Sequence, residues 1–131
     1  MKWYANFLVG CLVGAVGLAV LGMVAMPKLM LTVQESRYAT VDETTAALKS
    51  AIEAQGWQCP AIRNMNASMA KEGVVFESPI RIVELCKAEY AKEVLTDSPE
   101  VSTMMPCAWG VYQQDGKVWI SGMNMALMGK M

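Results

Sequence analysis

The chain has 131 residues, a formal net charge of -1 and no histidine. Its 11 basic residues are dispersed among 12 acidic ones, which excludes a basic stripe for nucleic acid, and the missing imidazole excludes Ser-His or Cys-His catalysis and histidine ligation of metals. A hydrophobic content of 54% exceeds what the core of one small domain needs, so part of the apolar sequence is expected elsewhere.

The first predicted element is a membrane-spanning helix over residues 7–26, "FLVGCLVGAVGLAVLGMVAM", which carry no charge. At about 1.5 Å per residue this segment spans roughly the 30 Å hydrocarbon core of a bilayer. We expect Pro27 to end the helix and residues 1–28 to form an N-terminal anchor. A cleaved signal peptide needs a shorter apolar core, and a bacterial lipobox at Cys11 fits less well because the apolar run continues beyond it.

Small residues lie on one face of this segment. Gly10, Gly14 and Gly17 allow another helix to approach closely, which is compatible with a protein partner or a homo-oligomer formed through the membrane helix. The alternative is that glycine is simply common in membrane helices.

Charge gives little information on orientation, since Lys2 lies on one side of the segment and Lys28 and Arg37 on the other. A short N-terminal tail before a large C-terminal domain is typical of a signal anchor that exports the domain. We therefore expect a single-pass protein of the bacterial inner membrane with a periplasmic C-terminal domain.

After the anchor, residues 31–39 alternate imperfectly between apolar and polar side chains, which predicts a first strand. Residues 40–56 predict a helix with defined ends. Thr40 followed by Glu43 is a capping box, and Gly56 is placed to end the helix.

The middle of the chain predicts short elements in quick succession. "WQCPAI" at 57–62 is typical of an edge strand, and "NMNASMAKEG" at 64–73 of a turn or a single helical turn. "VVFES" at 74–78 and "IRIVELC" at 80–86 predict one broken strand or two. "KAEYAKEVL" at 87–95 predicts an amphipathic helix.

Residues 108–124 predict a hairpin, because Asp115-Gly116 is a type I′ turn signal between two β-branched and aromatic strands. Helices that alternate with strands of this kind predict one α+β domain over residues 31–131. Its antiparallel sheet is expected to carry two helices on one face.

Three stretches together carry a family resemblance: "ELCKAEYAKEVL", "EVSTMMPCAWGVY" and "DGKVWISGMN". On these the chain resembles the domain-of-unknown-function family 302, in its membrane-anchored branch, over roughly residues 32–128. The resemblance implies a TBP-like α+β fold. The family has no established biochemical role, so the resemblance implies no catalytic residues.

Cys86 and Cys107 are the first candidates for chemistry. Cys86 begins the predicted second helix, where the positive end of the helix dipole favours a thiolate, and Cys107 opens the next predicted strand. If that strand pairs near the end of "IRIVELC", the two sulfurs could come within disulfide reach. Three readings stay open: a structural disulfide, small buried thiols, or a redox or ligand-binding pair. Cys59 leaves the count of cysteines in the domain odd.

Methionine is the second candidate, with 12 in the chain. Soft thioether and thiolate ligands select copper(I), so Met105 together with Cys86 and Cys107 could hold that metal. The alternative is that methionine fills the core and adaptable interfaces. The tail adds Met123, Met125, Met128 and Met131.

The carboxylates Glu72, Glu77 and Glu84 could flank a cleft, but no pair has the spacing of a catalytic acid and base. We therefore expect a non-enzymatic, membrane-anchored accessory or binding protein without a cofactor, embedded in lipid and associated with a larger membrane assembly. The alternative is a thiol-based redox or copper-binding protein that uses Cys86 and Cys107.

Overall fold

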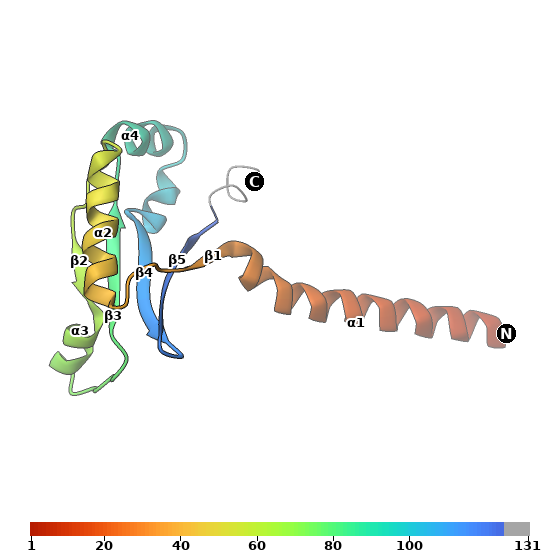
Figure 1. Cartoon of the computed structure of the whole chain (residues 1–131). Helices are drawn as coiled ribbons and strands as arrows, with labels where there is room; N and C mark the ends of the chain where they lie inside the picture. The colour runs from red at the N-terminus through yellow and green to blue at the C-terminus, as the bar shows by residue number, and fades with distance from the viewer. Residues whose placement is uncertain (125–131) are drawn as a thin grey trace. The chain divides into compact units, whose positions relative to one another are not determined.

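The structure, a computed structural model, describes residues 1–124 (Figure 1). These residues separate into an N-terminal unit, residues 1–32 with Asn124, and a compact unit, residues 33–123. The two units are described separately below.

The N-terminal unit is dominated by α1 (Lys2–Met30), a 29-residue helix with no buried side chain. By length and composition α1 could cross a membrane. The expected end at Pro27 is wrong, since the helix continues to Met30. Pro27 removes only one backbone donor, and the three residues after it can still bond to carbonyls in the preceding turn.

The compact unit is built on a five-stranded antiparallel sheet in the order β1-β5-β4-β3-β2. This sheet, with the helices around it and the apolar N-terminal helix, confirms the predicted α+β class. The strands are β1 (Leu31–Glu35), β2 (Ile62–Asn64), β3 (Ile80–Leu85), β4 (Cys107–Gln114) and β5 (Lys117–Met123). The helices are α2 (Val41–Ala54), α3 (Met65–Lys71), α4 (Ala88–Asp97) and the 3₁₀ helix η1 (Pro99–Met104).

Helix α2 forms as its cap signals predict. The Thr40 hydroxyl accepts a hydrogen bond from the Glu43 backbone N–H at 3.2 Å, and Gly56 takes a positive φ of 78° just after the helix. One face of α2 packs against β3 and β4 and forms the core, which consists of Val41, Leu48, Ile52, Val83, Val111 and Val118. We call the face of the sheet that α2 covers the core face, and the other the outer face.

The predicted hairpin is also present. Strands β4 and β5 pair from Gln114↔Lys117 to Trp109↔Gly122. Asp115 and Gly116 both have positive φ, 54° and 72°, as a type I′ turn requires.

Two predicted strands differ from the structure. Residues 74–78 form a loop between α3 and β3, in which the carbonyl oxygens of Phe76 and Ser78 accept hydrogen bonds from the Asn66 side chain and not from a strand. The strand expected at 57–62 is reduced to a single bridge between Gln58 and Cys86, and regular pairing begins only at Ile62, after Pro60.

The second predicted helix is present as α4, but its apolar side is only partly covered. Tyr90 and Val94, two of the apolar residues of this helix, are 52% and 40% exposed. Tyr90 packs edge-on against Trp57 with ring centroids 5.8 Å apart.

Candidate functional site

The cysteines of the compact unit gather at one end of the sheet, where β3 ends and β4 begins. Leu85, the last residue of β3, pairs with Cys107. One residue on, Cys86 exchanges two backbone hydrogen bonds with Gln58, of 2.8 and 2.9 Å. The prediction that the chain brings Cys107 beside the end of "IRIVELC" therefore agrees with the backbone pairing.

The two thiols nevertheless belong to opposite faces. Paired residues of an antiparallel sheet share a face, so Cys107 lies on the same side as Leu85, which packs against the core. Successive residues of a strand alternate, which places the Cys86 side chain on the outer face. All four cysteines of the chain are free. This register does not favour a bond between Cys86 and Cys107, and their use as a redox pair stays a prediction.

Cys59 has the clearest structural role of the three. It packs against the core cluster beside Trp57, and its thiol lies 3.9 Å from the carbonyl oxygen of Ala61. Like Cys107, it is half-buried on the core face.

Of the methionine candidates, Met105 and Met123 lie within the residues that the structure describes. Met105 follows η1, is half-buried, and is joined to Pro106 by a cis peptide bond. Met123 ends β5. Met125, Met128 and Met131 lie outside the described residues. Among residues 1–124 no group of three carboxylate or thiol side chains is arranged to hold a metal, so copper binding through Met105 stays a prediction.

Glu84, one of the carboxylates that the sequence suggested could flank a cleft, forms an ion pair with Arg63 on the outer face, and this pairing was not predicted. Glu84 is only 7% exposed, and its carboxylate accepts a hydrogen bond from Nε of Arg63, whose side chain is 63% exposed. Burying a carboxylate requires a compensating partner, and Arg63 on β2 supplies it. The sequence held one signal for a buried carboxylate, since Glu84 lies within the predicted strand, between Ile82 and Cys86.

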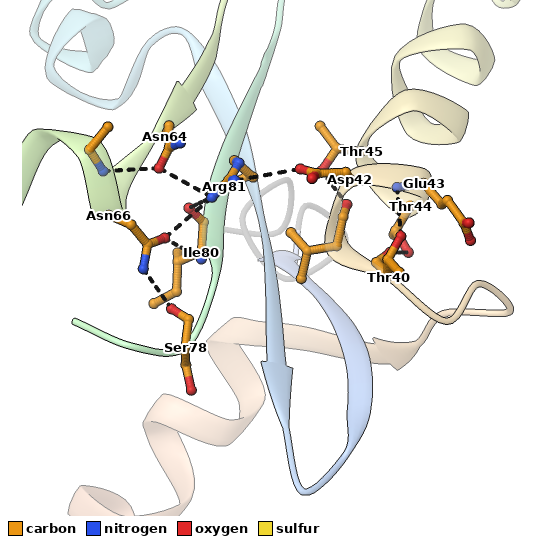
Figure 2. Close-up of polar contacts among 12 residues, drawn as sticks. Thr40, Asp42, Glu43, Thr44, Thr45, Asn64, Asn66, Ser78, Ile80 and Arg81 are labelled. Atoms are coloured by element: carbon orange, nitrogen blue, oxygen red, sulfur yellow. Dashed lines mark hydrogen bonds and ion pairs between the residues drawn. The ribbon is translucent and has the colours of Figure 1, made fainter.

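Arg81, on the core face of β3, lies at the centre of a polar network (Figure 2). Its Nη1 donates to Oδ1 of Asn64 at 3.2 Å and to Oδ1 of Asn66 at 3.3 Å. Its Nη2 lies 3.5 Å from the Asp42 carboxylate at the start of α2. Arg81 therefore joins α2, β2 and α3 to the central sheet, which is a structural role.

Asn66 completes this network by holding the loop before β3. Its Nδ2 donates to the carbonyl of Phe76 at 2.8 Å. The same Nδ2 donates to the carbonyl of Ser78 at 2.8 Å, and Oδ1 accepts from the backbone N–H of Ile80 at 2.8 Å (Figure 2). A single amide side chain thus fixes both the loop and the start of β3.

The predicted helix-packing face of α1 is open within its own unit. A Cβ added to Gly10, Gly14 or Gly17 would meet nothing within 4 Å among the described atoms. Association of this face with another helix stays a prediction.

These features define an α+β sheet domain preceded by an apolar helix, with free thiols at one end of the sheet and an ordered polar network at the other. The sequence model of the family described as Domain of unknown function DUF302 matches residues 32–131, and the chain belongs to that family. The fold is similar to the crystal structure of an uncharacterized conserved DUF302 protein from Bacillus stearothermophilus. The TM-score is 0.69 and the identity 23%, over 79% of this chain and 80% of that one. No curated protein matches the chain.

Proposed function

We propose that this protein is a single-pass protein of the bacterial inner membrane whose domain binds a protein partner at the membrane surface. The observation that carries this proposal is α1, in which residues 3–27 are uncharged and no described side chain is buried. A soluble protein would cover a helix that is apolar all round. At about 1.5 Å per residue, α1 is long enough for the roughly 30 Å hydrocarbon core.

Chain connectivity supports a role at the surface. Strand β1 begins at Leu31, directly after the last residue of α1. No linker therefore separates the two elements, and the domain is tethered where the helix ends. Such tethering raises the effective concentration of the domain toward partners in the same membrane.

Export of the domain to the periplasm is part of the proposal. In this orientation Lys2, which precedes the apolar segment, stays on the cytoplasmic side of the membrane. The orientation is measured with a reporter enzyme that is fused after residue 131 and is active only in the periplasm. Activity of a periplasm-only reporter is expected.

The glycine face of α1 supplies a means of association in the bilayer. Because nothing among the described atoms covers Gly10, Gly14 or Gly17, a second helix could approach the backbone there. The second helix belongs either to a partner or to another copy of this chain.

The decisive experiment uses the full chain in native membranes. We expect it to resist carbonate extraction and a variant lacking residues 2–30 to be released. Cross-linking through the helix should fall by roughly fivefold in Gly14→Leu, for about 1 kcal/mol of lost helix packing. Ala19→Leu, on the opposite side of the helix, is the matched control. A carbonate-soluble protein, or one that is monomeric without any partner, would refute the proposal.

A further inference from the structure

The loop between α3 and β3 exposes three consecutive apolar side chains, Val74, Val75 and Phe76, which we call the tip. They are 54%, 85% and 45% exposed. Val74 and Val75 are the two most exposed large hydrophobic residues that the structure describes after α1. Single exposed apolar residues are ordinary on a protein surface, whereas a contiguous apolar patch marks an interaction site.

The tip is held in place by its backbone and not by its side chains. The Val74 N–H donates to the carbonyl of Met69 at 3.0 Å, and the Phe76 carbonyl accepts from the Asn66 amide at 2.8 Å. Gly73 turns the chain with a φ of 78°. The exposed side chains therefore belong to an ordered loop. Ordering before binding lowers the entropy lost when a complex forms.

The charges beside the tip indicate which kind of partner it fits. Glu72 precedes it and Glu77 follows it, and neither takes part in an ion pair in the described part of the chain. Lys71 is the one basic residue within 71–79, so this stretch carries a net charge of -1. An anionic lipid surface attracts basic segments and repels acidic ones. A protein surface with basic side chains matches this loop better.

We propose that the tip docks into an apolar pocket of a partner protein whose rim carries lysine or arginine side chains facing Glu72 and Glu77. This rests on the proposed membrane-surface binding function and names the surface that performs it. Phe76 and Val75 supply the apolar anchor, and the two carboxylates lie at the polar rim, the arrangement found in specific interfaces. The carboxylates also speed the encounter with a basic surface.

The test places a photoreactive benzoyl-phenylalanine at Val75 in the full chain and irradiates native membranes. Val94, an exposed valine on α4, carries the same probe as the control. We expect the Val75 probe to bond to a protein, at a site lined by apolar and basic side chains. The yield should fall about tenfold in the double variant Glu72→Lys, Glu77→Lys, as expected when charge steering is reversed. Glu72→Gln with Glu77→Gln should give an intermediate loss, and both variants should keep the wild-type Tm.

Several results would overturn the inference: bonds only to lipid, bonds only to a second copy, no bond, an equal yield from Val94, or a yield that charge reversal leaves unchanged. Capture of a protein without this dependence on Glu72 and Glu77 counts against it as well. Failure of the proposed function is separate, because carbonate extraction and cross-linking through α1 do not involve the tip.

Discussion

Substituting Gly122 by alanine tests the packing of the core face. Gly122 pairs with Trp109 across β4 and β5, and the indole ring lies directly over the glycine. A Cβ at residue 122 would lie 2.6 Å from Cδ1 and 2.8 Å from Nε1 of Trp109, well inside the 3.4 Å at which ordinary contact begins. Because Trp109 also packs against the core, the ring cannot move without disturbing it. We expect Gly122→Ala to lower the free energy of unfolding by about 2 kcal/mol, the usual range for overpacking being about 1–3 kcal/mol.

The assay is urea unfolding of the full chain in mild detergent. Unfolding is monitored by far-UV circular dichroism, because this signal remains when Trp109 is replaced, whereas tryptophan fluorescence would change. In a Trp109→Leu background the clash is absent. Gly122→Ala should then be neutral or stabilise the fold by about 0.5–1 kcal/mol, because alanine loses less backbone entropy on folding than glycine does. The double-mutant cycle should therefore give a coupling of about 2 kcal/mol or more. Gly110→Ala is the matched control: its Cβ would meet the rotatable Ser121 hydroxyl at 3.1 Å, and a cost below about 1 kcal/mol is expected. An equal cost of Gly122→Ala in both backgrounds would refute the reasoning.

Three further substitutions or measurements test other contacts. Asn66→Ala removes the amide that holds the loop, so amide hydrogen exchange over residues 74–80 should accelerate and stability should fall by about 1–2 kcal/mol; unchanged exchange would show that the loop is held in another way. Thr40→Ala removes the cap of α2 and should cost about 1 kcal/mol in urea unfolding, and no change would contradict the cap. Because Cys86 and Cys107 face opposite sides of the sheet, mild oxidation of the membranes should leave both thiols free. After the protein is unfolded, both should react with maleimide. A disulfide between them, detected by mass spectrometry, would contradict the register.

Helix α2 and the β4–β5 hairpin could be predicted because their signals are local. The Thr40 side chain reaches the N–H of Glu43 within a single turn. The turn at Asp115 and Gly116 needs two residues that tolerate positive φ, and the dipeptide itself carries that property. Neither element depends on knowledge of a distant partner.

Residues 74–78 show where a local pattern fails. Their β-branched and aromatic composition is typical of a strand, but a strand also needs a neighbour with free backbone groups. Here the carbonyl oxygens of Phe76 and Ser78 accept hydrogen bonds from the Asn66 side chain instead of from a neighbouring strand. Which group bonds to the backbone of a segment depends on the fold around it, and the segment alone cannot reveal it.

The cysteine site shows a finer limit. The approach of Cys107 to the end of β3 could be predicted from the order of elements, but the register could not, and a shift of one residue moves a side chain to the other face. The ion pair between Glu84 and Arg63 likewise depends on strand register. The two residues are 21 positions apart, and they meet because of how β2 pairs with β3.

The position of β1 in the sheet has a consequence for the order of events during synthesis. Strand β1 neighbours β5, and Lys117 of β5 lies 3.3 Å from the Glu35 carboxylate of β1, 82 residues earlier in the chain. At about 5–20 residues per second, the ribosome needs roughly 4–16 s to make the chain between them. Helix α1 is complete before that interval begins. The first strand of the sheet, already joined to α1, therefore has no partner strand until β5 is made 82 residues later.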